Sequence, residues 1–318
     1  MTTNFLQARN AASQRWDAID IARGIAIVAM IIYHFSWDLS FLKLIGTNIL
    51  QIPAWRWFAR GIAASFLALA GFGLALAHAQ GFRPLPFVRR LVKVGGAALV
   101  VTLVTFFAFP ESYIFFGILH CIAASSILGL PFLRLPPALT MIVAALCLAA
   151  PRLFTSPDLD APWLDWLGLG ASEPMTNDYV PIFPWFGCVL IGVAAGQVLL
   201  PLKETLRLAR WQAGNALGKA LVWAGRKSLP IYLVHQLVLL GILYGVLQIV
   251  GPHPSAACQQ VCLMQGGQPS LCPSVCACIV EDVPGRKFWR RVLDNDLTTE
   301  DQTRISKAAQ QCVRHPPS

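Results

Sequence analysis

The sequence has little charge for its length. Only 13% of its 318 residues are charged, whereas soluble domains carry about 25%, and 56% of the residues are hydrophobic, with a mean hydropathy of +0.58. These figures exclude a soluble enzyme, a collagen-like chain and a disordered acidic chain. The apolar residues come in blocks of roughly 20, the length of a helix that crosses a bilayer, and short alternating segments of a membrane β-barrel are missing. The composition therefore predicts an integral membrane protein.

The sequence also shows no cleavable signal peptide. The first ten residues are polar, and the first apolar run is too long for a signal sequence and lacks a small-residue cleavage site. We predict an all-α fold, a polytopic transmembrane bundle of about seven helices over 19–39, 57–79, 88–109, 112–131, 136–150, 180–200 and 228–250. The predicted domains are an N-terminal tail over 1–16, a transmembrane domain over 17–250 and a small Cys-rich helical tail over 251–318.

The basic residues predict the orientation of the chain. Their formal excess of +9 is better explained by topology than by nucleic acid, so no nucleic-acid partner is expected. With a cytoplasmic N-terminus, the outer segments hold only Lys43, Arg56, Arg60 and Arg152. The inner segments then hold Arg9, Arg15, Arg23, Arg83, Arg89, Arg90, Lys93, Arg134, Lys203, Arg207, Arg210, Lys219, Arg226 and Lys227. Seven helices place the C-terminal tail outside.

Cysteine is concentrated in the tail, which holds Cys258, Cys262, Cys272, Cys276, Cys278 and Cys312. An even set in a short extracytoplasmic segment favours disulfides, and the C-x3-C, nine residues, C-x3-C pattern can join two antiparallel helices. Six cysteines allow 15 pairings, among which the spacing does not choose. A zinc site is the alternative, although the usual C-x2-C spacing is missing.

The first predicted helix carries ionisable residues on one face. At about 100° per residue, Asp20, Arg23, His34 and Asp38 fall close together around the helix. Charges within a membrane helix are costly, about 2.5 to 3.5 kcal/mol each on insertion scales, and therefore call for a function. A carboxylate at i+4 can hold one ring nitrogen of His34 while the other acts as a general base. The alternative is a histidine at headgroup level beside a solvated aspartate.

Further polar residues occur in the later helices. His120 lies about halfway through 112–131, while His235 and Gln236 lie in the first half of 228–250. Each histidine alone is more often an interhelical hydrogen-bonding residue, but three in one bundle favour a shared polar cavity. Asp178 precedes the helix 180–200, whose two prolines, Pro181 and Pro184, predict a broken entry lining protein or water.

Two basic clusters lie on the predicted cytoplasmic side. Retention by the positive-inside rule accounts for most of them. The alternative is that some bind a phosphate-rich cytosolic molecule, for which the bidentate guanidinium of arginine is suited. The clusters contain Arg83, Arg89, Arg90 and Lys93 before the third helix, and Arg207, Arg210, Lys219, Arg226 and Lys227 before the seventh.

Several of these stretches together resemble one family. They are Arg15 to Ala26 with Met30 and Tyr33 to Leu39, Phe66 to Gly71, Phe116 to His120, Asp178 to Gly187, and Gly225 to Gln236. This set is similar to the heparan-α-glucosaminide N-acetyltransferase catalytic family of membrane acyltransferases. The resemblance covers about residues 15 to 240. The lysosomal members have more helices and a large luminal segment, and the Cys-rich tail is outside the family pattern.

The resemblance implies transfer of an acetyl or acyl group from cytosolic acetyl-CoA to an amino or hydroxyl group of an extracytoplasmic glycan or amino sugar. It implies that His34, in a His-x-Ser-Trp context, is the active histidine, and we expect Asp38 to orient it. Candidate contacts for the CoA phosphates are Arg89, Arg90, Lys93 and Arg226. Candidate cavity residues are Asp20, Arg23, His120, Asp178, His235 and Gln236. The expected partners are membrane lipids and the acceptor, and no metal is expected.

Two other classes of function remain open. A proton-coupled transporter would use intramembrane ionisable residues such as Asp20, Arg23, His120 and His235 as a relay. No internal repeat relates two halves of the bundle, however, and seven helices divide unevenly. A membrane anchor that presents the disulfide-rich tail is the third reading.

Overall fold

The structure is a computed structural model that describes residues 16–202 and 211–314. The predicted tail residues Arg9 and Arg15 and the basic residues Lys203, Arg207 and Arg210 lie outside the described residues. Within the described ranges the fold is all-α, with no β-strand, as predicted. The chain divides into two compact units, residues 1–29 with 59–233 and residues 30–58 with 234–318. Each unit is described by itself.

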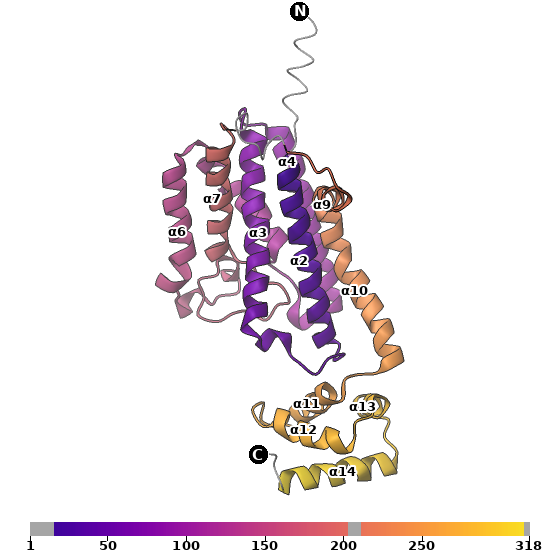
Figure 1. Ribbon diagram of the computed structural model, residues 1–318. Coiled ribbons are helices and arrows are strands. Elements are labelled where there is room, and N and C mark those ends of the chain that lie inside the picture. The colour runs from indigo at the N-terminus through magenta and orange to yellow at the C-terminus, as the bar shows by residue number, and fades with distance from the viewer. Residues whose placement is uncertain (1–15, 203–210, 315–318) are drawn as a thin grey trace, which may run out of the picture. The chain divides into compact units, whose positions relative to one another are not determined.

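The long helices are those of a membrane protein. Among the described residues, five helices are long and apolar enough to cross a bilayer. Their large apolar side chains face outward, as at Phe107, which is 80% exposed, and such a surface is stable only against lipid. The five are α2 (Asp17–Phe41), α3 (Pro53–His78), α4 (Pro84–Ala108), α7 (Ile182–Leu199) and α10 (Ser228–Val250) (Figure 1).

Two shorter apolar helices complete the predicted set of seven. These are α5 (Ile118–Leu128) and α6 (Pro137–Leu153). α6 packs along α7, and the two run side by side in Figure 1. A further helix, α9 (Ala216–Arg226), was not predicted; it begins where the side chain of Asn215 accepts a hydrogen bond from the backbone N–H of Gly218 at 2.7 Å.

Small residues let the helices of the first unit approach closely. A side chain at Gly24 of α2 would collide with the backbone of Leu221 in α9, and one at Gly71 of α3 would collide with the backbone of Val189 in α7. In membranes, where helix association depends on packing rather than on the hydrophobic effect, such contacts hold helices together. They fix the start of α2 against α9, which positions the charged residues described below.

The helix predicted over 112–131 is wrong at its start. Only Ile118–Leu128 is helical, because the preceding segment bonds to a distant part of the chain. The backbone N–H of Asn177 donates to the carbonyl of Ser112 at 3.0 Å, and that of Val180 donates to the carbonyl of Phe116 at 3.1 Å. Backbone groups paired in this way are satisfied without a helix.

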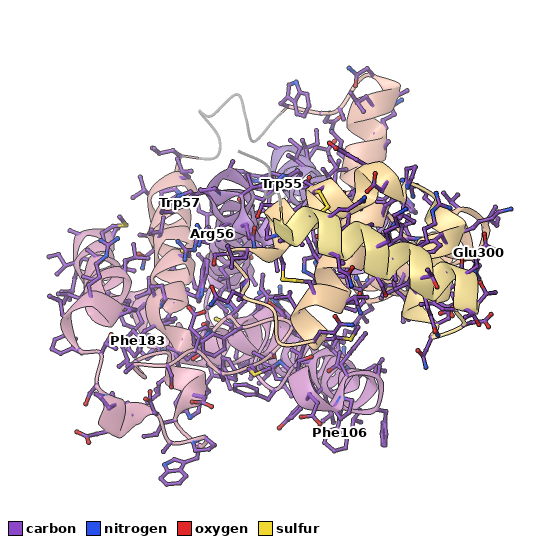
Figure 2. All side chains as sticks on the ribbon, turned by 90° about the horizontal axis from the view of Figure 1, so that it is seen from below. Trp55, Arg56, Trp57, Phe106, Phe183 and Glu300 are labelled. Atoms are coloured by element: carbon purple, nitrogen blue, oxygen red, sulfur yellow. A yellow bond between two sulfur atoms is a disulfide. The ribbon has the colours of Figure 1, made fainter. Side chains whose placement is uncertain are left out.

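The entry to α7 is broken, as its prolines predict. Phe183 has non-helical backbone angles, φ −99° and ψ 128°, inside the span of α7, and it stands between Pro181 and Pro184. Its side chain is labelled in Figure 2. Val180 and Ile182 beside it are buried in the core of the first unit, so this irregular backbone is covered by protein, as a membrane protein requires.

The second unit contains the later part of α2, the first turns of α3, the later part of α10 and the tail. Tyr33 of α2 packs against Trp55 and Phe58 of α3, with ring centroids 6.3 and 6.5 Å apart. Figure 2 labels Trp55, Arg56 and Trp57, which share the first turns of α3. Trp57 is 67% exposed, which fits the predicted belt of aromatic residues at a membrane interface.

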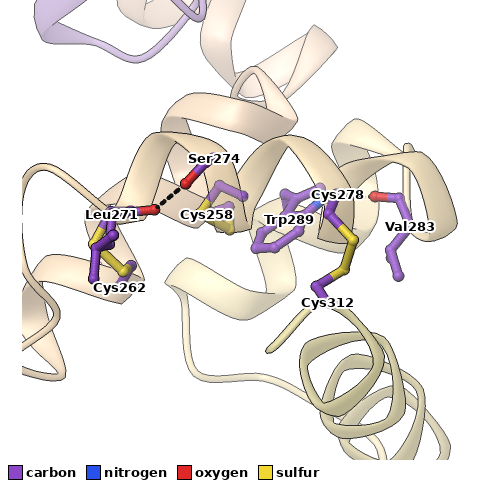
Figure 3. The surroundings of a disulfide bond; sticks show 10 residues. Cys258, Cys262, Leu271, Ser274, Cys278, Val283, Trp289 and Cys312 are labelled. Carbon is purple, nitrogen blue, oxygen red and sulfur yellow. Dashed lines mark hydrogen bonds between the residues drawn. A yellow bond between two sulfur atoms is a disulfide. The ribbon is translucent and has the colours of Figure 1, made fainter. Parts of the chain in front are cut away.

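The tail is a four-helix module held by the predicted disulfides. Its helices are α11 (Pro254–Met264), α12 (Cys272–Asp282), α13 (Arg286–Leu293) and α14 (Thr299–Arg314). Cys258 bonds to Cys276 and Cys262 to Cys272, so the outer and the inner cysteines of the two C-x3-C motifs pair, as antiparallel helices require. The third bond, Cys278–Cys312, joins α12 to α14 (Figure 3). The disulfide prediction is confirmed, and these sulfurs are committed to one another rather than to zinc.

Inside the module, Trp289 is almost fully buried, and its indole N–H donates to the carbonyl of Val283 at 2.7 Å (Figure 3). The module is also bonded to the end of α10 and to the loop after α2. The guanidinium of Arg286 donates to the carbonyls of Gly251 and Leu44, at 3.2 and 3.5 Å. Burial and the charge of Arg286 together lower the pKa of His253, so this histidine is neutral at pH 7.

Candidate active site

The first unit contains a cavity of about 560 Å³, a volume typical of sites for small ligands. Its walls are largely apolar, from α3, α4, α5 and α10. The apolar lining includes Phe66, Leu69, Val94, Ile118, Leu119, Ile122 and Leu229. Polar groups occur mainly at one end, where Asp20, Arg23, Arg90, Arg226, Ser228 and Tyr232 line it.

Asp20 organises the arginines at this end. It is only 5% exposed, and its two carboxylate oxygens accept hydrogen bonds from different arginines. Arg226 donates to Oδ2 at 2.9 Å and Arg23 to Oδ1 at 3.4 Å. Arg226 also donates to Asp17 at 3.0 Å. The hydrogen bond from Asp20 raises the pKa of Arg226 further above its ordinary value, so this guanidinium stays charged.

Arg23 and Arg90 converge around Gly73 on α3. A side-chain carbon at Gly73 would lie 2.9 Å from a guanidinium nitrogen of Arg23 and 3.9 Å from one of Arg90. Arg90 donates to the backbone carbonyl of Ala70 at 3.3 Å and forms no ion pair with a carboxylate of residues 16–202 or 211–314. Three guanidinium groups and two carboxylates thus leave a formal charge of +1. Cations placed this closely are unfavourable unless an anion joins them.

The structure separates the four arginine and lysine residues predicted to contact CoA phosphates. Arg90 and Arg226 line the cavity. Arg89 and Lys93 are exposed and are absent from its lining, although they belong to the same helix as Arg90. The helical step of about 100° explains the difference, because neighbouring residues point in different directions.

Asp178 holds the beginning of α5. Its Oδ2 accepts a hydrogen bond from the backbone N–H of Ile118 at 3.1 Å, and Ile118 and Leu119 line the cavity. Burial raises the pKa of Asp178, while the N–H of Ile118 acts in the opposite direction. A side chain at Gly117 would collide with this carboxylate, so the glycine makes room for it. Asp178 therefore positions a wall of the cavity and does not line it.

His120 has a similar supporting role. Its Nε2 is 3.1 Å from the hydroxyl of Thr102 on α4, and its Nδ1 accepts the backbone N–H of Gly117 at 3.2 Å. The same hydroxyl donates to the carbonyl of Ile114 at 2.7 Å. His120 thus joins α5 to α4 and fixes the non-helical segment before α5. It was predicted as a cavity residue but does not belong to the lining.

The role of Asp178 gives a testable prediction. Replacement of Asp178 by Ala leaves the N–H of Ile118 without its acceptor, and we expect a loss of about 1–3 kcal/mol of stability. Asp178→Asn keeps an oxygen at the same place and should cost much less. Thermal unfolding of the purified protein in detergent measures both, with Glu173→Ala, an exposed acid of the same loop, as the control. Equal damage by Asn and Ala would show that the charge is needed rather than the hydrogen bond.

A second polar cluster lies in the other unit and contains four predicted residues. The rings of His34 in α2 and His235 in α10 are 4.9 Å apart between centroids, inclined at 63°. One turn along α2, Asp38 is fully buried, and its Oδ1 accepts a hydrogen bond from the amide of Gln236 at 2.7 Å. The two helices therefore meet through two polar contacts.

The predicted hydrogen bond from Asp38 to His34 is not among these contacts. Oδ2 of Asp38 and Nδ1 of His34 are both buried, and neither has a hydrogen-bond partner among the described residues. Asp38 bonds to Gln236 instead. Buried polar atoms of this kind are rare in folded proteins and are found mainly where a site binds or reacts.

Sequence reasoning missed three features of the cavity. Asp17 was read as part of the helix start only, although it binds Arg226 from 209 positions away. Tyr232 lines the cavity from α10, four residues after Ser228. Gly73, which makes room for two guanidinium groups, gives no signal in the sequence beyond being one glycine among 24.

The fold and these two clusters define a polytopic helical membrane protein with a cation-lined cavity and a buried histidine pair. The family model of the heparan-alpha-glucosaminide N-acetyltransferase catalytic domain matches residues 15–237, and the chain belongs to this family of acetyltransferases. The match contains every candidate site residue and ends before the Cys-rich tail. Comparison with curated proteins and with solved structures gave no match.

Proposed function

We propose that the protein moves an acetyl group, or a related acyl group, from cytosolic acetyl-CoA to an amino or hydroxyl group of an extracytoplasmic glycan. The observation that carries the proposal is the cavity with three arginines at one end, inside the domain that the family model matches. The family is one of membrane acetyltransferases, and its printed name specifies a glucosaminide acceptor.

The cavity has the chemistry that an acyl-CoA donor needs. CoA carries phosphate groups at one end and a long, weakly polar arm that ends in the thioester. The guanidinium groups of Arg23, Arg90 and Arg226 suit the phosphates, because each offers a planar fork of donors. The apolar walls beyond them suit the arm. Arg89 and Lys93 are left to the positive-inside rule, since their side chains lie outside the lining.

His34 is the proposed general base. Its buried Nδ1, without a partner among the described residues, is a proton acceptor for the attacking amine or hydroxyl. The acceptor oxygen or nitrogen then forms a bond to the acyl carbon, the bond from that carbon to sulfur breaks, and the sulfur leaves with a proton as free CoA. Asp38, whose Oδ2 is available, is proposed to orient the imidazole during the reaction. A route through an acetyl-histidine uses the same residue as a nucleophile.

The proposed orientation places the N-terminus in the cytoplasm. The arginine end of the cavity is formed by the start of α2, the start of α4 and the α9–α10 junction, where the basic residues collect. The disulfides support an extracytoplasmic tail, because such bonds form in oxidising compartments. α5 is short for a crossing, yet the chain beside it joins opposite ends of the first unit: Ser112 bonds to Asn177 before α7, and Phe132 to Gln197 near its end.

Calorimetric titration of the purified protein with acetyl-CoA tests the donor without knowledge of the acceptor. We expect saturable binding that free CoA competes away and that ATP and acetate do not reproduce. Absence of binding at about millimolar acetyl-CoA, a free energy near −4 kcal/mol, would contradict the proposal and favour transport instead. A positive result leads to assays of CoA release with amino-sugar acceptors.

A further inference from the structure

The contact of two histidine rings in the second unit suggests a role beyond that of a cavity wall. His34 and His235 approach to 4.9 Å with one ring tilted against the other, and the carboxylate of Asp38 lies one turn further along α2. Asp38 is fully buried, so its charge is not compensated by water. One proton shared by the two rings compensates this carboxylate. A second proton would place two like charges in contact, and only one of them would be compensated.

No other charged group alters this count from the neighbouring elements. The side chains of α3 that contact Tyr33, next to His34, are the aromatic Trp55 and Phe58, and Arg56 between them is exposed. From α10, the residue that follows His235 is the neutral Gln236, which is bonded to Asp38. The titratable groups that face His34 are therefore Asp38 on its own helix and His235 on the other.

We propose that His235 is a positioning residue for transfer, which holds the His34 ring and carries the one proton of the pair, so that His34 stays neutral and able to accept a proton from the acceptor. Gln236 supports this arrangement, because its bond to Asp38 fixes the carboxylate beside the pair. The inference rests on the proposed function, in which His34 is the general base.

The pH profile of transfer by His235 variants tests the inference. His235→Gln removes the place where the first proton rests, so that this proton goes to His34. We expect the acid side of the rate profile to move to higher pH by about one unit, with the rate at alkaline pH largely retained. His235→Lys restores a positive charge beside Asp38 and should return the acid side of the profile toward that of the unchanged protein. His78→Gln, in a membrane helix but bonded to Leu74, is the matched control and should leave the profile in place.

The outcomes separate this inference from the proposed function. Binding of acetyl-CoA, measured in parallel, should be the same in both variants, which also shows that they fold. Transfer that falls equally at every pH in His235→Gln would overturn the inference, since it indicates a structural role alone. A profile that stays in place would overturn it as well. If the unchanged protein neither binds acetyl-CoA nor releases CoA, the proposed function itself fails.

Discussion

Replacement of His34 by Ala is expected to abolish acyl transfer while acetyl-CoA still binds. General base catalysis typically contributes about 10²- to 10⁴-fold, and no other ring nitrogen of the pair is placed to take over fully, because His235 is proposed to hold the compensating proton. The rate of CoA release with an amino-sugar acceptor measures the loss. Donor binding should be nearly unchanged, because the arginine-lined cavity does not include His34.

Phe35→Ala is the matched control for this prediction. Phe35 is the next residue of α2, is 42% exposed and loses a ring of similar size, so its replacement reports any general effect on the helix. Full turnover by His34→Ala would remove the histidine from the mechanism. Labelled acetyl groups that stay on the protein in the absence of acceptor, and are lost in His34→Ala, would favour the acetyl-histidine route over direct transfer.

A reversal of charge at Arg90 is expected to have the second large effect. Arg90→Glu should weaken acetyl-CoA binding by about 100-fold, because it removes one charge-assisted contact to phosphate and disturbs another. The new carboxylate would lie beside Arg23, since the guanidinium groups of Arg23 and Arg90 both lie around Gly73, and would form an ion pair with it. Calorimetric titration with acetyl-CoA measures the change.

Arg89→Glu provides an unusually close control. It changes the net charge by the same amount, at the next position of the same helix, and should affect membrane insertion to the same degree. Its side chain lies outside the cavity, so we expect donor binding to be retained. Equal losses in the two variants would assign both arginines to topology and would remove the cavity from the donor site.

The sequence alone determined the class of protein and several of its boundaries. Low charge and apolar blocks of about 20 residues predicted the membrane helices, because a bilayer accepts few other backbones. The predicted helix 228–250 agrees with α10, and the tail cysteines form disulfides as predicted. The periodicity of α2 placed His34 and Asp38 on one face, since helical geometry is local.

The tertiary structure decided what depends on residues far apart in the chain. It paired Ser112 and Phe116 with 176–180, which shortened α5, and it selected one of 15 cysteine pairings. It brought Arg90 into the cavity while Arg89 stayed outside, and it placed His235 against His34 from 201 positions away. Spacing along one helix fixes only the direction of a side chain. Which group it meets there depends on the packing of other helices, which no local pattern specifies.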